Sequence, residues 1–280
     1  MNRASFLGLC YSDIFDYPLT KEELKKWGIK ELRSKVEDYP RVGIKELRSK
    51  YRYQDGFYFL SGREKIIALR QKRAEISQKK LVLGEKIAGI LQRIPFIKLI
   101  AVTGALAMKN SDDKDDIDLL IITQKNRVWL TRVLAVLILE ILGKRRRPND
   151  ESFGNKICLN MFLDEDNFKI PSLERNLYAA HEVIQVRPIY NREQTYEKFL
   201  KQNSWVDGYL PRVRDKSIKY EKASIKQNNS FLDLVEVICY KLQYVYMKSK
   251  ITRETVEKNR LLFHPRDTGK IVLEKFEKRV

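Results

Sequence analysis

The chain has 280 residues and a formal net charge of +18, with 43% hydrophobic and 33% charged residues. Its length allows one large domain or two to three small ones, and its apolar fraction is sufficient for a hydrophobic core. The longest apolar stretch, 128–142, contains two charged residues and is too short to cross a bilayer, so the composition excludes a transmembrane protein.

The positive charge lies mainly in the two ends of the chain. Residues 1–98 carry a net charge of +10 and residues 193–280 one of +7, whereas residues 99–192 are nearly neutral at +1. Basic flanks around a neutral centre favour modules that bind a polyanion, with nucleic acid as the expected partner. A solvated basic surface, or a general enrichment in lysine, would give the same pattern, so these interpretations stay open.

Cysteine usage indicates the compartment. Cys10, Cys158 and Cys239 are odd in number, far apart and set among apolar residues, which favours buried thiols in a reducing environment. The N-terminus lacks the apolar core of a signal peptide. We therefore expect a cytoplasmic protein without a membrane partner.

Residues 1–62 carry the signals of a small helical module that ends in a hairpin. Apolar spacing predicts a helix over 4–14, and Thr20 with Glu23 has the spacing of a capping box at the start of a second helix. Asp55 and Gly56 predict a turn before an aromatic strand. The order resembles a winged-helix domain, with the hairpin as its wing.

The octapeptide GIKELRSK occurs in this module twice, at 28–35 and at 43–50. Two copies are too few for a solenoid, so a local duplication is the simplest interpretation. One copy would form the recognition-type helix and the other an inserted extension, and both assignments stay open. Either copy could contact phosphates through its lysine and arginine side chains.

A long basic helix is predicted over 63–92, since apolar residues recur along it in a broken stripe. Pro95 ends this helix, so the segment 63–96 is expected to link the N-terminal module to the centre of the chain. The next apolar run, 97–102, is predicted to be a strand.

The region 97–192 contains the most informative pattern. Gly104 follows the strand 97–102, and a second strand begins with Asp116 and Asp118. Alternation along a strand places both carboxylates on one face. Two adjacent carboxylates stay ionised most readily around a divalent cation, and oxygen ligands suit Mg²⁺ or Mn²⁺. A glycine at a strand end lets the backbone approach a phosphate.

Three further elements are predicted around this pattern. Asn126 is expected to cap a helix over 127–142, which Gly143 ends. The cations 144–147 would contact a triphosphate or a nucleic acid, or would only favour the helix C-terminus, and both alternatives stay open. A strand over 156–163 would place Cys158, Asn160 and Phe162 on one face.

The remainder is predicted to be mainly helical. A helix over 171–186 contains His181, which we interpret as a structural or surface histidine, since no second ligand is nearby. The segment 193–225 is expected to hold a short helix and a loop, followed by an amphipathic helix over 231–250. Another helix would begin over 252–258, and residues 261–265 would form an apolar plug before a basic helix from Thr268. The region 193–280 is thus expected to be a helical bundle.

The central motif resembles the nucleotidyltransferase superfamily, with its DNA polymerase β-like fold. In this chain eleven residues separate Gly104 from the acid pair Asp116 and Asp118, which fits the family's spacing. Ala105 stands where the family usually has serine. Asn160 stands on the strand that usually carries a third carboxylate, and the acids 164–166 after that strand could replace it.

The resemblance implies an α/β (α+β) fold with a small mixed β-sheet core at 97–192, between a winged-helix-like module and a C-terminal helical region. It implies that Asp116 and Asp118 bind Mg²⁺ or Mn²⁺ and are catalytic, with Asn160 orienting an acceptor or a water. A nucleoside triphosphate (NTP) would contact Thr103, Gly104 and Ala105, and also Lys144 and Arg145.

Two functions remain open at this point. The first is a metal-dependent nucleotidyltransferase that moves a nucleoside monophosphate from an NTP to a hydroxyl of a nucleic acid or protein. The second is a catalytically degenerate protein of the same fold that acts as a nucleic-acid-binding regulator or scaffold. Ala105 and Asn160 favour the second, and the retained acid pair favours the first.

Overall fold

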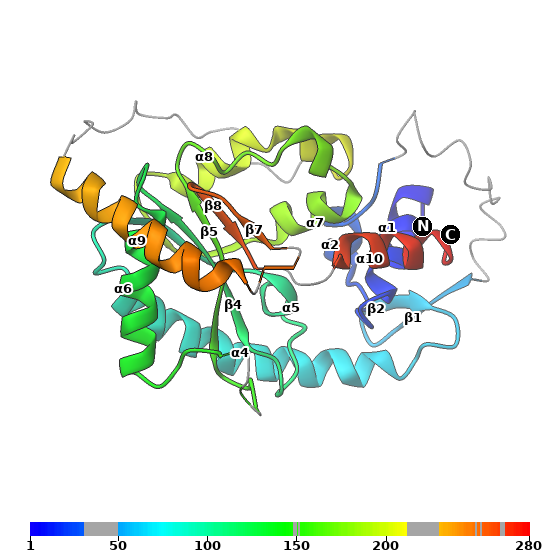
Figure 1. Ribbon diagram of the computed structural model, residues 1–280. Helices are drawn as coiled ribbons and strands as arrows, with labels where there is room; N and C mark the ends of the chain where they lie inside the picture. The colour runs from blue at the N-terminus through cyan, green and yellow to red at the C-terminus, as the bar shows by residue number, and fades with distance from the viewer. Residues whose placement is uncertain are drawn as a thin grey trace.

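The computed structural model describes residues 1–30, 50–147, 150, 152–211, 230–249, 251–252, 254–263 and 267–280. The described chain is a mixed α/β structure with a six-stranded sheet and a separate two-stranded hairpin. Figure 1 shows the sheet in the centre, with the N-terminal elements and the last helix gathered at one end. Most of the repeated octapeptide and the predicted loop after residue 211 lie outside the described residues.

The six-stranded sheet has the order β6-β3-β4-β5-β8-β7, with parallel pairing between β4 and β5 and antiparallel pairing elsewhere. In this order its strands are β6 (Arg187–Asn191), β3 (Ile97–Val102), β4 (Ile117–Thr123), β5 (Ile157–Asp164), β8 (Arg260–Leu262) and β7 (Thr255–Val256). The central strands β3 and β4 are almost wholly buried, which explains their continuous apolar sequences. The predicted mixed sheet is therefore present.

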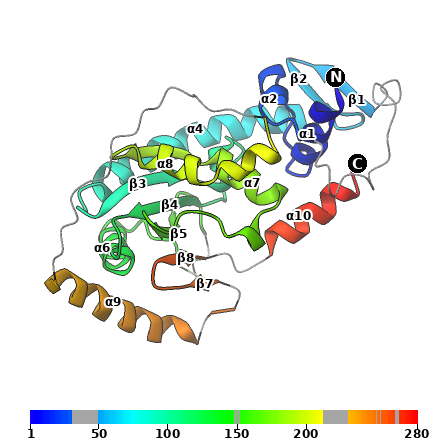
Figure 2. The same cartoon turned by 90° about the horizontal axis from the view of Figure 1, so that it is seen from above.

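Helices cover both faces of the sheet, as Figures 1 and 2 show. One face packs against α4 (Ile66–Leu91) and α6 (Val128–Ile141) through Leu81, Trp129 and Leu139. The other face packs against α7 (Leu177–Gln185) and α8 (Thr195–Gln202) through Ala180 and Phe199. Residues on β4 alternate between these two cores, so Asp118 lies on the α7 face.

The N-terminal module contains α1 (Arg3–Asp13), α2 (Lys21–Lys26) and the hairpin of β1 (Tyr51–Gln54) and β2 (Phe57–Leu60). The capping box of Thr20 and Glu23 is present, as predicted. Leu19 exchanges both backbone hydrogen bonds with Tyr58, which ties the start of α2 to the hairpin. The buried residues of α1 and α2 belong to the same hydrophobic core as the α7 face of the sheet.

Helix α4 confirms the predicted long basic helix. Its Lys80 is 2% exposed, and its ammonium donates to the backbone carbonyls of Asp112, Asp113 and Asp115. Burial lowers the pKa of Lys80, while the surrounding acids oppose that shift. The acidic segment before β4 is therefore anchored to α4, although its sequence alone suggests a solvated linker.

Helix α6 begins at Val128, and the prediction that Asn126 caps it is wrong. The cap is supplied by Glu236 of α9 (Ser230–Lys248), whose carboxylate accepts from Trp129 N and Leu130 N at 2.8 Å each. A carboxylate stabilises the free N–H groups of a first helical turn. A long-range contact thus replaces the local cap that the sequence suggested.

The predicted helix over 252–258 is also wrong, because residues 255–256 form β7 and residues 260–262 form β8. These strands extend the core sheet, so the region 193–280 is not a purely helical bundle. The helix predicted over 171–186 is shorter, with a 3₁₀ turn (Ser172–Glu174) and then α7, capped by Asn176. A further 3₁₀ turn (Ser204–Gly208) follows α8.

The last helix, α10 (Thr268–Glu277), returns to the N-terminal module. Asp13, the last residue of α1, binds the guanidinium groups of Arg63 at 3.0 Å and of Arg279 at 2.9 Å. One buried carboxylate therefore connects α1 both to the segment before α4 and to the segment after α10. None of the described helices has both the length and the apolarity needed to cross a membrane.

Candidate functional site

The acid pair lies where β4 begins, beside β5. Asp116 immediately precedes the strand, and Asp118 is its second residue. Asp116, Asp118 and Cys158 each offer one potential ligand atom, and these three atoms all lie within 4.8 Å of one another. Alternation along β4 therefore brings both predicted metal-binding carboxylates to one place.

Gly104 faces the acid pair from α5 (Gly104–Ala107), the short helix after β3. Its φ is +61°, and a Cβ built on it would lie 3.1 Å from Asp118 Oδ2. The backbone N–H of Thr103 donates to the Asp118 carbonyl at 3.0 Å, which fixes the loop against β4. Glycine is required here both for the left-handed backbone and for the close approach of the carboxylate.

The two carboxylates have different surroundings. Burial, and then the charge of Asp116, raise the pKa of Asp118 to about 6, although a hydrogen bond with Cys158 opposes the shift. Burial also raises the pKa of Asp116, and the charge of Arg146 opposes it. Burial and the two neighbouring carboxylates raise the pKa of Cys158 well above its ordinary value, so its thiol keeps its proton.

Arg146 is the member of the basic segment that reaches the acid pair. Its Nε lies 2.9 Å from Asp116 Oδ2, and its Nη1 donates to Cys158 Sγ at 3.5 Å. Arg145 and Arg147 instead bind Glu140 at the end of α6. Arg145, which was predicted to bind phosphate, is therefore directed away from the acid pair. The backbone N–H of Lys144 donates to the Leu139 carbonyl, and the Lys144 carbonyl accepts from Ile157 N.

Asn160 is 8% exposed and lies beside the acid pair in β5, but the predicted alternation of that strand is wrong. The register slips by one residue, because Asp118 pairs with Cys158 whereas Leu120 pairs with Met161. This bulge puts Asn160 and Met161 on the α7 face and returns Phe162 to the opposite core. Phe162 thus does not share a face with Asn160.

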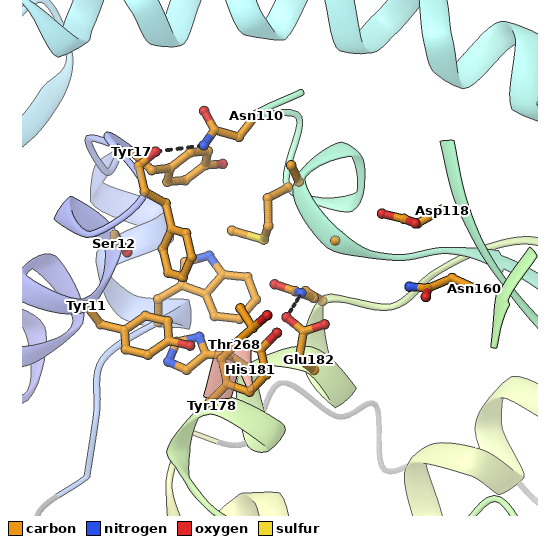
Figure 3. Close-up of a pocket in the computed structure, with 16 residues that line it drawn as sticks. Tyr11, Ser12, Tyr17, Asn110, Asp118, Asn160, Tyr178, His181, Glu182 and Thr268 are labelled. Atoms are coloured by element: carbon orange, nitrogen blue, oxygen red, sulfur yellow. Dashed lines mark hydrogen bonds between the residues drawn. The ribbon is translucent and has the colours of Figure 1, made fainter. Parts of the chain in front are cut away.

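A cavity of about 280 Å³ opens beside Asp118, Asn160, Gly104 and Ala105. Its other walls come from α1, α7 and the residues around α2, and they are largely aromatic. Figure 3 shows Asp118 and Asn160 on one side of this pocket, Tyr11 and Tyr17 on the other, and Glu182 between them. Asp118 therefore stands at the wall of a partly open pocket between the sheet and the N-terminal module, and Asp116 lies outside its lining.

Glu182 is a site residue that the sequence analysis missed. Burial, and also the charge of Asp118, raise its pKa to about 7, while the side-chain amide of Gln185, which donates to it, opposes the shift. It lines the same pocket as Asp118, from α7, and lies outside the cluster of Asp116, Asp118 and Cys158. The one signal in the sequence is that Glu182 is a charged residue on the apolar side of the amphipathic helix α7, which is unusual unless the side chain faces a polar site.

The predicted structural role of His181 fits its surroundings. It is 4% exposed, and its ring stacks on Tyr11 with 3.8 Å between centroids. Burial lowers its pKa to about 3, so the imidazole is neutral. Its Nε2 is buried without a hydrogen-bond partner at the wall of the pocket.

The donor set of the acid pair fits a hard divalent cation. Two carboxylates supply the oxygen ligands that Mg²⁺ and Mn²⁺ prefer, and these ions commonly complete their coordination with waters or phosphate oxygens. The protonated thiol of Cys158 is a poor ligand for such an ion. Since Arg146 neutralises Asp116 in this structure, a cation must compete with that guanidinium.

Comparison with family models found none that matches the chain, and comparison with curated proteins found no similar protein.

Proposed function

We propose that the protein is a metal-dependent nucleotidyltransferase that moves a nucleoside monophosphate from an NTP to an acceptor hydroxyl. The observation that carries the proposal is the clustering of Asp116 with Asp118, where Asp118 lies against Gly104 and lines a pocket. The mixed sheet and the spacing of this motif support a nucleotidyltransferase core at 97–192. The capping box, the hairpin and the Leu19–Tyr58 pairing support a winged-helix-like module.

In this proposal Asp116 and Asp118 would hold Mg²⁺ or Mn²⁺, which would supply positive charge opposite the triphosphate. The acceptor oxygen forms a bond to the α-phosphorus, the bond from that phosphorus to the bridging oxygen breaks, and pyrophosphate leaves. The loop of Thr103, Gly104 and Ala105 borders the triphosphate. Arg146, once released from Asp116, is placed to bind a phosphate oxygen.

Asn160 and Glu182 face the acceptor side of the pocket. The amide of Asn160 can orient an acceptor hydroxyl but cannot take its proton. The proton of that hydroxyl passes to water as the bond to phosphorus forms. Glu182 supplies a negative charge on the acceptor side of the pocket and is assigned to acceptor binding.

The test is transfer of labelled nucleotide from each of the four NTPs, with Mg²⁺, to total RNA, protein and small-molecule extracts. We expect the double variant Asp116→Asn with Asp118→Asn to lose about 100-fold or more of the transfer, because the metal-binding oxygens are removed at nearly constant volume.

The control is Asp113→Asn, which changes an exposed acid of the same segment and leaves the acid pair intact. Transfer that survives in the double variant would contradict the site assignment.

One observation favours a second candidate, the catalytically degenerate nucleic-acid-binding protein. Arg146 already neutralises Asp116, and Cys158 is hydrogen-bonded with Asp118, so the pair persists without a metal. Tight, salt-sensitive binding of RNA or DNA that the double variant retains, together with no response to Mg²⁺ and NTP, would support this candidate.

A further inference from the structure

The pocket beside Asp118 is acidic, although the chain as a whole carries a net charge of +18. Among the residues that the structure describes, its lining includes the carboxyl groups of Asp118 and Glu182 and no lysine or arginine. Arg70 and Lys26 contact the rings of Tyr17 and Trp27, but neither lines the pocket, and Arg70 is bound to Glu23. A phosphate group inserted into the part of the pocket near Glu182 would meet a carboxylate and no cation, so the proposed triphosphate is confined to the edge formed by Gly104 and Ala105.

The wall of the pocket on the far side from Asp118 is aromatic. Tyr11, Tyr17, Trp27 and Tyr178 line the pocket together with Phe15. Aromatic faces attract organic ammonium groups, and they also stack on flat rings.

The size of the pocket limits the group that enters it. A cavity of about 150 Å³ holds one benzene molecule. The volume of about 280 Å³ beside Asp118 therefore admits one or two rings with their substituents, which a small molecule fills completely.

We infer that this pocket binds a small aromatic amine that carries a hydroxyl group, with its ammonium held by Glu182 and its ring held by the aromatic walls. The inference rests on the proposed function, because it makes this molecule the acceptor of the nucleotide. It replaces the expectation that the acceptor is a nucleic acid or a protein. In that case the basic regions 1–98 and 193–280 do not bind the acceptor.

The experiment is calorimetric titration of the full chain without metal or nucleotide, using three probes with the same phenol ring. Tyramine carries an ammonium group, 4-ethylphenol carries no charge, and 4-hydroxyphenylacetate carries a carboxylate. We expect tyramine to bind about tenfold or more tightly than 4-hydroxyphenylacetate, with 4-ethylphenol between them. Glu182→Gln should weaken tyramine binding about tenfold and leave 4-ethylphenol within about twofold.

The matched control is Glu85→Gln, which makes the same charge change at an exposed position of α4 and should alter none of the three affinities. Equal affinities for the three probes, a preference for the anion, or displacement of tyramine by a single-stranded RNA oligonucleotide would each overturn the inference. So would unchanged tyramine binding in Glu182→Gln. Because metal and nucleotide are absent, the result is independent of the proposed transfer activity, which the double aspartate variant tests separately.

Discussion

At the scale of single residues, the contact between Arg146 and Asp116 determines how the acid pair behaves without a metal. The guanidinium lies 2.9 Å from the carboxylate, and it also stacks over the Phe153 ring at 4.6 Å. Arg146 partly neutralises Asp116, so a cation at the proposed metal site would have to compete with this guanidinium.

We expect Arg146→Gln to bind Mn²⁺ about three- to tenfold more tightly than the wild-type chain in the absence of nucleotide, because the competing charge is removed. Titration followed by electron paramagnetic resonance measures the free Mn²⁺ directly. Arg147→Gln, which loses only its contact with Glu140, is the matched control. Weaker Mn²⁺ binding in Arg146→Gln would show that the arginine assists the metal instead of competing with it.

Glu182 gives a second prediction, which concerns pH. The folded protein raises the pKa of Glu182 from 4.5 to about 7, so between these values the native state binds more protons than the unfolded state. The stability from this group is fully present below about pH 4 and is lost as pH rises to about 7. Gln is neutral throughout. Relative to the wild type, Glu182→Gln should therefore gain about 1–3 kcal/mol in unfolding free energy between pH 4.5 and pH 8.

Urea unfolding at the two pH values measures this difference. A gap between wild type and variant that stays constant with pH would mean that Glu182 ionises as freely in the native state as in the unfolded state.

The acid pair and Gly104 could be predicted from the sequence because their relation is local, set by strand alternation and by one short connection. Glu182 and Arg146 could not be singled out in this way. Glu182 is brought to the site by α7 packing on the sheet, and the choice of Arg146 over Arg145 depends on which of them Glu140 binds. Contacts of that kind are decided by tertiary packing.

At the scale of elements, the turn at Gly104 sets the distance between the β3–α5 loop and the acid pair. Gly143 provides a comparison, since its φ is also +61° but no atom of the described residues is found within 4 Å of a Cβ built there. An alanine at either position has the same unfavourable backbone conformation, and only at Gly104 does it also press on Asp118.

We expect Gly104→Ala and Gly143→Ala to destabilise the protein similarly, by about 1 kcal/mol, because both force a side chain into the left-handed region. Only Gly104→Ala should also weaken Mg²⁺-dependent nucleotide binding, by displacing Asp118. Thermal unfolding and nucleotide titration of both variants check this. Equal nucleotide affinities in the two variants would contradict the assigned role of Gly104.

Helices and strands that are defined by residues adjacent in sequence could be predicted, and those defined by contacts with distant segments could not. The helix α4, the capping box of α2 and the hairpin turn at Asp55 follow from residues adjacent in sequence. The two- and three-residue strands β7 and β8 are too short to carry a periodic pattern, and pairing with β5 defines them. The bulge at Asn160 likewise depends on its neighbour β4.

At the scale of the whole molecule, the described N-terminal module and the core sheet do not form separate hydrophobic cores. Tyr11 and Trp27 share one core with Leu99 and Leu120 of the sheet and with Phe276 of α10. The pocket lies inside this shared region, so both parts of the chain build its walls. The proposed transfer site therefore requires the N-terminal module in place.

The central claim is that Asp116 and Asp118 form a metal–nucleotide site. It is tested most directly by thermal unfolding of the full chain with Mg²⁺ alone, with each NTP alone, and with both together. A ligand that binds only the folded state at about 100 times its dissociation constant adds about 2.7 kcal/mol of stability. We predict clear stabilisation when metal and one NTP are both present, little with either alone, and none in the Asp116→Asn, Asp118→Asn variant. Stabilisation by an NTP without metal, or equal stabilisation of that variant, would contradict the claim.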